Sequence, residues 1–316
     1  PPCVNTIDPN DPQTSKQTAV SFTPVTAEDI QNGSVELKLP ETKTTDGKNA
    51  HFIFTDTLVS TNLAKVVSVT DKEEKGTPYT EYNLDFSSLK GMDASEIEGK
   101  TTPAGIPDKA YAESQGWDYQ ETLDAFGPEQ ADPNETAKVD ADGNRKRMAD
   151  EQHYYQADLS GLTADDVSDG DYVLVSVYYR GTGQLFNGGS SVVMHNRCYV
   201  MDFFNDDGIN AITDYWDNYI LNDTELAAMI RENGGSIFED SIEANKTTNL
   251  WAPDLKEEIA AYYGENYQYQ DVIAAVVASE RTYGGFGASA DPKDLVYTYD
   301  NEEEKELGAR IVEDYN

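Results

Sequence analysis

The sequence predicts a protein whose first part is β-rich and whose last part is α/β. Residues 34–86 contain runs in which apolar and polar side chains alternate, as in an antiparallel sheet with one solvated face. After Asp206, apolar side chains recur at helical spacing on both sides of a short apolar run within 236–243. A short strand between helices, with acids at its C-terminal end, is typical of open α/β sheets and (β/α) barrels.

The composition limits the classes of partner. The chain has 316 residues, with 59 acidic and 23 basic side chains and a formal net charge of −36. Because this charge repels the nucleic-acid backbone and anionic lipid, we expect neither as a partner. No apolar run is long enough to span a bilayer, so we expect no membrane span. A solvated surface on an extracellular or salt-adapted protein is the simplest explanation of the charge.

Residues 1–170 are interpreted as an antiparallel β-rich region. Residues 1–30 have no clear period and are predicted to form an extended loop. Alternating apolar residues predict strands at 34–39, 51–59, 64–69 and 81–86. Residues 90–150 are polar and charged over much of their length and are interpreted as an excursion from the sheet. The cysteines are Cys3 and Cys198, and the sequence is compatible with a bridge or with two separate thiols.

Residues 171–316 are interpreted as the α/β region. It begins with Tyr172–Tyr179, which is apolar at nearly every position and therefore predicts a strand covered on both faces. Apolar stripes, capping residues and glycine stops predict helices at 209–220, 224–233, 253–263, 269–277 and 300–315. The last of these reaches Asn316 without a Gly, Pro or capping residue, so we expect the natural chain to continue.

The stretch Ser236–Glu243 holds the main candidates for chemistry. Its apolar residues predict a short strand, on which Glu239 and Asp240 point to opposite sides, and Glu243 lies two residues past its end. Two carboxylates at a strand end suit general acid–base work on a glycosidic bond, or binding of a hard cation. In an equally simple interpretation, Asp240 caps the following segment and Glu239 pairs with a basic residue.

A second set of candidates lies in predicted loops. His195 and Arg197 follow the strand at 172–179, and such side chains can bind an anionic or polyhydroxyl ligand. The structural alternative is that Arg197 pairs with an acid and His195 bonds to backbone. Trp251 follows the acidic stretch, where its ring can stack on a sugar, whereas Trp216 lies on an apolar stripe and is predicted to be core.

Five segments in a fixed order carry a resemblance to a known family. They are Tyr178-Tyr-Arg-Gly-Thr-Gly-Gln184, Met194-His-Asn-Arg197, Tyr199-Val-Met-Asp-Phe-Phe-Asn205, Asn233-Gly-Gly-Ser-Ile-Phe-Glu-Asp-Ser-Ile-Glu243 and Trp251-Ala-Pro-Asp-Leu255. Together they resemble the large bacterial α-L-rhamnosidase-like proteins of glycoside hydrolase family 106. The resemblance covers about 172–285 and is carried by the order and spacing of the segments.

The resemblance implies an α/β fold: part of a (β/α)8 TIM-type barrel with a β-rich inserted region. It implies a secreted bacterial protein, extracellular or at the cell surface, that hydrolyses terminal α-L-rhamnosides of polysaccharides or oligosaccharides with inversion. The family's activity implies two glutamates and a calcium ion. By this likeness Glu243 is a catalytic or calcium-binding acid with Asp240 beside it. His195, Arg197 and Trp251 are expected to line the sugar site.

The length of the α/β region adds an expectation about completeness. A TIM barrel needs about 250 residues, more than residues 171–316 provide. We therefore expect this chain to be the middle section of a longer polypeptide and to be inactive alone, with a second catalytic glutamate beyond Asn316. The alternative is a non-catalytic carbohydrate-binding or cell-surface interaction protein on a glycosidase-like scaffold.

Overall fold

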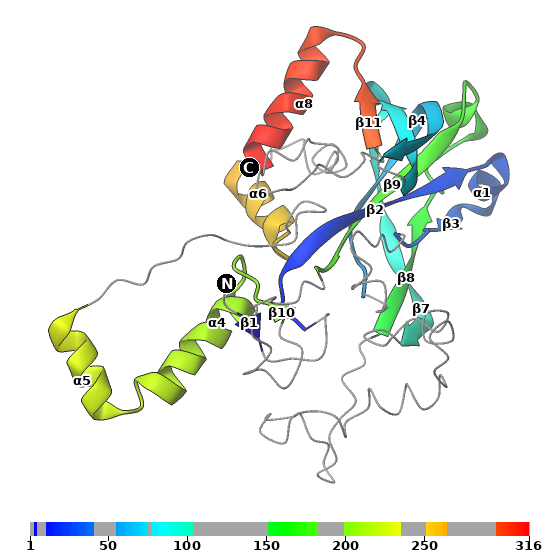
Figure 1. Cartoon of the computed structure of the whole chain (residues 1–316). Helices are drawn as coiled ribbons and strands as arrows, with labels where there is room; N and C mark the ends of the chain where they lie inside the picture. The colour runs from blue at the N-terminus through cyan, green and yellow to red at the C-terminus, as the bar shows by residue number, and fades with distance from the viewer. Residues whose placement is uncertain are drawn as a thin grey trace.

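The computed structural model describes residues 3–4, 11–40, 55–74, 77–103, 151–182, 199–234, 251–263 and 295–315. Within these residues, strands predominate over helices (Figure 1). The largest unit is a six-stranded sheet with the strand order β11-β5-β4-β9-β2, in which β6 also pairs with β4. Its strands are β2 (Lys16–Val25), β4 (Thr57–Glu74), β5 (Thr77–Asp85), β6 (Lys90–Met92), β9 (Tyr172–Gly181) and β11 (Leu295–Thr298).

Strand β9 lies inside this main sheet, between β2 and β4, and is antiparallel to both. In its register Gln17 lies opposite Arg180 and Asn62 lies opposite Val175. Strand β5 is antiparallel to β4, and β11 is parallel to β5. The predicted strand at 172–179 is therefore confirmed, but its neighbours are strands from the first half of the chain.

A second sheet has the order β3-β8-β7 and is antiparallel throughout. It consists of β3 (Ser34–Glu36), β7 (Ala94–Pro103) and β8 (Glu151–Asp158). A short antiparallel pair joins β1 (Cys3–Val4) to β10 (Tyr199–Val200), with Val4 opposite Tyr199.

The two faces of β9 contribute to two apolar cores, because successive side chains of a strand point to opposite sides. Val173, Val175 and Val177 pack with a cluster that contains Leu84 and Trp251. Leu174, on the other face, packs with Leu63 of β4 and with Ala157 of the second sheet. This burial on both faces explains why β9 is apolar at nearly every position.

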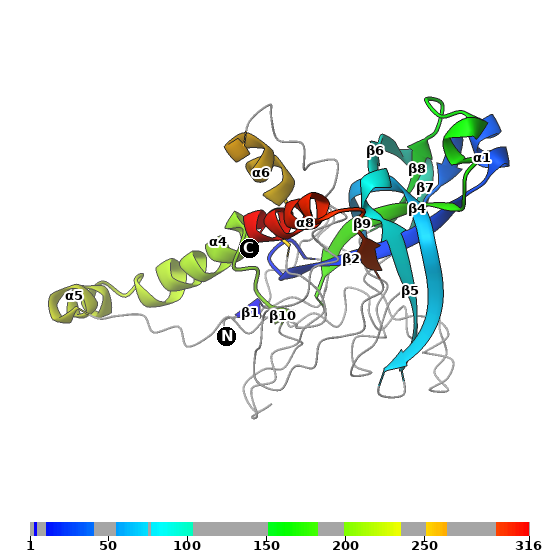
Figure 2. The ribbon, with the colours of Figure 1, turned by 90° about the horizontal axis from the view of Figure 1, so that it is seen from above.

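The helices lie outside the sheets (Figures 1 and 2). They are α1 (Ala27–Asn32), α4 (Asp206–Tyr215), α5 (Thr224–Asn233), α6 (Leu255–Tyr263) and α8 (Glu302–Tyr315), with a π-helical turn η4 (Trp216–Ile220) and 3-10 turns η1 (Phe86–Ser88) and η3 (Ala164–Val167). Helices α4 and α5 extend away from the sheets, whereas Leu255 of α6 packs against the core beneath β9. No helix among the described residues is long and apolar enough to cross a membrane.

The predicted (β/α)8 barrel is wrong. Such a barrel requires consecutive parallel strands, each followed by a helix, whereas β9 pairs antiparallel with β2 and β4. In the described part of the chain, β5 and β11 form the parallel pair. The inference failed because a strand buried on both faces has the same apolar pattern in a barrel and inside a sheet covered on both sides.

Several predictions about the first half of the chain are also wrong. Residues 16–25, expected to be loop, form β2, and residues 90–103, expected to leave the sheet, form β6 and β7. Strand β2 begins with the buried polar residues 16–18, so the alternation of apolar and polar residues that marks a strand is absent from its first residues. Its place depends on β9, which lies far away in the sequence.

The helix predictions after Asp206 are confirmed for α4, α5, α6 and α8, and the predicted helix at 269–277 lies outside the described residues. Helix α5 begins after Asp223, whose carboxylate accepts hydrogen bonds from the backbone N–H groups of Glu225 and Leu226 at 3.0 Å. At α8 the capping residue is Asn301, whose Oδ1 accepts a hydrogen bond from the N–H of Glu304 at 3.0 Å.

Candidate functional site

One end of the main sheet, where β2 begins and β9 ends, is both buried and polar. Its buried polar residues are Thr14, Ser15, Lys16, Gln17 and Thr18 at the start of β2, Arg180 and Thr182 at the end of β9, and Asp202 after β10. Protein interiors are mostly apolar, and polar groups within them need hydrogen-bond partners. We therefore take this polar strand end, defined by these residues, as the candidate site.

Backbone hydrogen bonds at the polar strand end join three of the segments that carry the family resemblance. The N–H of Thr182 donates to the carbonyl of Ser15 at 2.8 Å, and the N–H of Ser15 donates to the carbonyl of Val200 at 2.9 Å. The N–H of Trp251 donates to the carbonyl of Lys16 at 3.2 Å. Segments 178–184, 199–205 and 251–255 are therefore all bonded to the start of β2.

Asp202 connects the end of β10 to the first turn of α4. It is 0% exposed, and its carboxylate accepts hydrogen bonds from the backbone N–H of Phe204 at 2.9 Å and from Nδ2 of Asn205 at 2.7 Å. The N–H of Asp202 donates to the carbonyl of Gln13 at 2.8 Å. Asn205 in turn caps α4, because its Oδ1 accepts a hydrogen bond from the N–H of Gly208 at 2.9 Å.

Gly208 is required where α4 meets this turn. A Cβ atom at position 208 would lie 1.9 Å from the carbonyl oxygen of Asp202, far inside van der Waals contact. Because that obstacle is backbone, a side chain cannot be accommodated by a rotamer change. The close approach fixes the first turn of α4 directly against Asp202.

The surroundings of Asp202 change its acidity. Burial raises the pKa of Asp202 to about 6, and the carboxylates of Asp254 and Asp207 also raise it. The hydrogen bond from Phe204 and the charge of Lys16 act in the opposite direction. Relative to the ordinary value of 3.8, ionised Asp202 costs about 3 kcal/mol of folding stability at neutral pH. Asp202 can therefore exchange a proton near neutral pH.

Lys16 supplies a buried positive charge beside this acid. Its Nζ donates hydrogen bonds to the carbonyl oxygens of Asp11 at 2.8 Å and Thr14 at 2.5 Å. Because of these bonds, residues 11–14 fold around the ammonium group. The N–H of the next residue, Ser15, donates to the carbonyl of Val200 in β10. Lys16 and Asp202 thus belong to two segments that are hydrogen-bonded to each other through their backbones.

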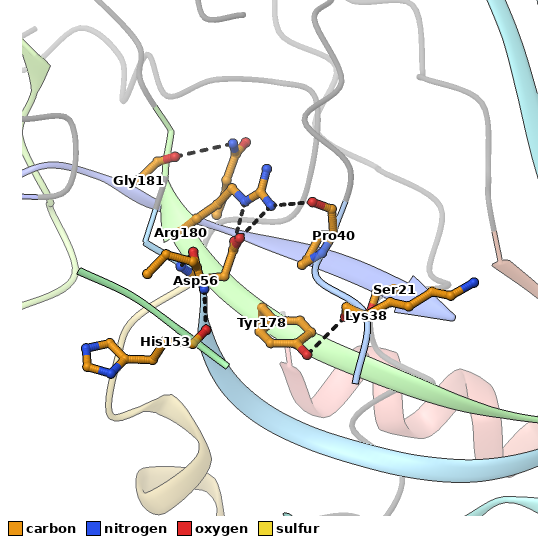
Figure 3. Close-up of polar contacts among 10 residues, drawn as sticks. Ser21, Lys38, Pro40, Asp56, His153, Tyr178, Arg180 and Gly181 are labelled. Atoms are coloured by element: carbon orange, nitrogen blue, oxygen red, sulfur yellow. Dashed lines mark hydrogen bonds and ion pairs between the residues drawn. The ribbon is translucent and has the colours of Figure 1, made fainter. Parts of the chain in front are cut away.

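A second polar group at the same strand end is the ion pair of Arg180 and Asp56 (Figure 3). Nε and Nη2 of Arg180 donate to the two carboxylate oxygens of Asp56 at 2.6 and 3.0 Å, and Nη2 also donates to the carbonyl of Pro40 at 3.0 Å. Both side chains are 5% exposed. Burial raises the pKa of Asp56, and the Arg180 charge opposes this. This geometry attaches the end of β9 to the residues before β4.

Four of the five predicted site residues, His195, Arg197, Asp240 and Glu243, lie outside the described residues. Trp251 is described, and it is 2% exposed with its side chain in the core cluster beneath β9. The structure therefore places the Trp251 ring among core residues and not, as was predicted, at a surface where it could stack on a sugar.

Three of the described residues that adjoin the undescribed segments, Thr182, Tyr199 and Trp251, lie at or next to the polar strand end. Thr182 and Tyr199 flank residues 183–198, which contain His195 and Arg197, and Trp251 follows residues 235–250, which contain Asp240 and Glu243. Thr182 and Trp251 are bonded to the start of β2, and Tyr199 lies in the β1–β10 pair.

Sequence reasoning missed Asp202, Lys16 and the Arg180–Asp56 pair. A signal for Asp202 was present, because an acid three residues before an N-capping Asn, with Gly208 three residues further on, marks a tight entry into a helix. No pattern around Lys16 predicts burial of a lysine. The partnership of Arg180 with Asp56 joins positions 124 apart in the chain and leaves no local signal.

Searches for a matching family model, a related curated protein and a similar solved structure found none. Among the residues that the structure describes, no group of three His, Cys, Asp or Glu side chains is placed to hold a metal ion. The described part of the site thus offers a buried acid, a buried lysine and a buried ion pair. Such groups can hold segments in place and hold or release a proton.

Proposed function

We propose that the chain is part of a glycoside hydrolase that removes terminal α-L-rhamnosyl units from polysaccharides outside the cell or at its surface. The proposal begins from the five ordered segments that resemble family 106. The observation that supports it most is that the described parts of three segments, 178–184, 199–205 and 251–255, are bonded together at the polar strand end. The proposal does not require the barrel fold.

The chemistry proposed for this site is inverting hydrolysis by two carboxyl groups. One protonates the leaving oxygen while the other activates a water molecule on the opposite face of the sugar. Glu243 supplies one of these groups or a metal ligand, and Asp240 positions the substrate or a calcium ion. Carboxylate oxygens are the donors that Ca²⁺ prefers. His195 and Arg197 bind hydroxyl groups, and Trp251 fixes the segment after Glu243 against β2.

The test is the release of nitrophenol from an aryl α-L-rhamnoside by the complete natural polypeptide. We expect Glu243→Gln to lower kcat by about a hundredfold or more, the usual contribution of a general acid or base. Glu239→Gln is the matched control, because Glu239 is predicted to point away from Asp240, and it should leave kcat unchanged. Full turnover by the Glu243→Gln variant would remove the proposed role.

The second candidate function is carbohydrate binding without hydrolysis. The predominance of antiparallel sheet supports it, because two-sheet β architectures are common among lectin domains. Calorimetric titration with rhamnose-containing polysaccharides, with and without a calcium chelator, separates the two candidates. Binding without release of sugar favours the second candidate, whereas turnover favours the hydrolase.

A further inference from the structure

We propose that Asp202 is a positioning residue, whose carboxylate fixes the turn between β10 and α4 through Phe204 and Asn205 and thereby orders the polar strand end. Its relation to catalysis rests on the proposed function, whereas its role in fixing the turn does not. Asp202 is 0% exposed, so it acts through the residues that it holds.

Each carboxylate oxygen of Asp202 accepts a different hydrogen bond. Oδ1 accepts the hydrogen bond from the N–H of Phe204, and Oδ2 accepts the bond from Nδ2 of Asn205. Asn205 cannot exchange its amide oxygen and nitrogen without loss, because Oδ1 accepts from Gly208 at 2.9 Å and Nδ2 also donates to Pro12 at 3.4 Å. The donor and acceptor pattern of the turn is therefore fixed from both sides.

The turn between β10 and α4 also holds residues 11–14 in place. The N–H of Asp202 donates to the carbonyl of Gln13, and Nδ2 of Asn205 contacts the carbonyl of Pro12, so residues 11–14 are attached to it. Those residues surround Lys16, whose own carbonyl accepts the N–H of Trp251. Loss of the Asp202–Asn205 bond should therefore loosen the place where residues 251–255 are anchored.

This coupling depends on pH. The charged groups that affect Asp202 are Lys16 from β2, Asp207 from α4 and Asp254 from the turn before α6. Because the folded pKa of about 6 lies above the ordinary 3.8, the folded chain binds the proton more tightly than the unfolded chain. The stability cost of Asp202 is complete above about pH 6 and disappears as the pH falls towards 3.8. Protonation also turns one acceptor oxygen of the carboxylate into a hydroxyl donor.

The test is a cycle of Asp202→Asn, Asn205→Asp and the double variant, measured by thermal unfolding between pH 4 and 7. In Asp202→Asn a single amide oxygen faces two donors, the N–H of Phe204 and Nδ2 of Asn205, so one of them is left opposite an NH₂ group. In Asn205→Asp two carboxylates face each other. The double variant restores a donor opposite an acceptor and keeps an oxygen for the N–H of Gly208, because Asp is also a good N-cap. Asp202→Asn also removes the buried negative charge, so the coupling between the two positions carries the test: at pH 7 the double variant should melt a few degrees higher than the sum of the two single-variant shifts predicts.

The matched control is Asp206→Asn, which removes an exposed acid in the same turn and should leave the pH dependence near 6 unchanged. The double variant should lose that dependence, because its carboxylate lies at a more exposed helix N-terminus. Single-variant shifts in melting temperature that add up to the shift of the double variant would overturn the proposal.

Activity is the second measurement. If the protein hydrolyses an aryl rhamnoside, the single variants should lower kcat by up to about a hundredfold with little change in KM, and the double variant should recover kcat. The acid side of the double variant's pH profile should lie at lower pH than in the wild type. An inactive wild-type protein would contradict the proposed function but leave the unfolding cycle as a test of Asp202. A cycle without coupling in an active enzyme would contradict the role of Asp202 alone.

Discussion

At the scale of single residues, buried polar side chains divide into two kinds. Those of the polar strand end have hydrogen-bond partners, as Asp202 does. Asn62, in the middle of β4 and opposite Val175, differs from them. It is 0% exposed, and within the described part of the chain neither atom of its amide group has a hydrogen-bond partner. An unsatisfied buried amide lowers the stability of the fold.

Asn62→Val should therefore stabilise the protein by about 1–3 kcal/mol, because it removes the desolvation cost from an apolar face. The free energy of unfolding in urea measures this. Thr61→Val is the control and should lower the free energy of unfolding, because it removes the hydrogen bond of 2.9 Å between Oγ1 of Thr61 and Oγ of Ser176. A less stable Asn62→Val variant would show that the amide makes a favourable interaction.

At the scale of elements, the end of β9 is held by a buried ion pair as well as by its ladder. Arg180 and Asp56 form a two-pronged bond, and Gln152 of β8 accepts the N–H of Asp56 at 2.9 Å. A buried charge without its partner is strongly unfavourable, whereas an apolar pair of similar volume is often tolerated. The pair therefore specifies which segments meet at this end.

We expect Asp56→Leu and Arg180→Met to lower the free energy of unfolding by about 3–5 kcal/mol each, and the double variant to lose much less than their sum. A double-mutant cycle from urea midpoints gives the coupling. The exposed pair of Lys72 and Glu81 on the β4–β5 hairpin, 2.6 Å apart, is the control, and Lys72→Met should barely move the midpoint. Additive losses for the Arg180 and Asp56 variants would contradict this account.

Elements whose ends are marked by nearby residues were predicted correctly, whereas elements that depend on residues far away in the sequence were missed. Asp223 and Gly234 mark the ends of α5 in the sequence, and the structure has them there. Strand β2 was missed because its first residues are polar and are buried by pairing with β9, and Ser15 just before the strand is hydrogen-bonded to Thr182. Likewise, Asp202 lies within a segment that was noticed, but its pKa is raised mainly by burial, to which distant parts of the chain contribute, and the charges of Lys16 and Asp254 also act on it.

At the scale of the whole molecule, the dominant property is the net charge of −36. Like charges distributed over a folded surface repel one another, and this repulsion weakens the compact state. Dissolved salt shortens the distance over which these charges interact, to about 10 Å at 0.1 M. The stability of the fold should therefore depend on ionic strength.

The melting temperature at pH 7 should rise when sodium chloride is increased from about 0.02 to about 0.5 M, because screening reduces the repulsion. The same salt series near pH 4 provides the control, since the isoelectric point of about 4.1 leaves little net charge to screen. A melting temperature at pH 7 that falls with salt would mean that attractive ion pairs outweigh the repulsion.

The position of β9 within the main sheet also has a consequence for synthesis. Val20 of β2 lies opposite Val177, 157 positions later, so β2 leaves the ribosome long before its partner exists. Strand β4 also pairs with β9 and is likewise synthesised before it. Contacts between such distant positions fold slowly, and unpaired strand edges invite association with other chains. In the nascent polypeptide, β2 and β4 must therefore avoid pairing with strands of other chains until β9 (Tyr172–Gly181) has been translated.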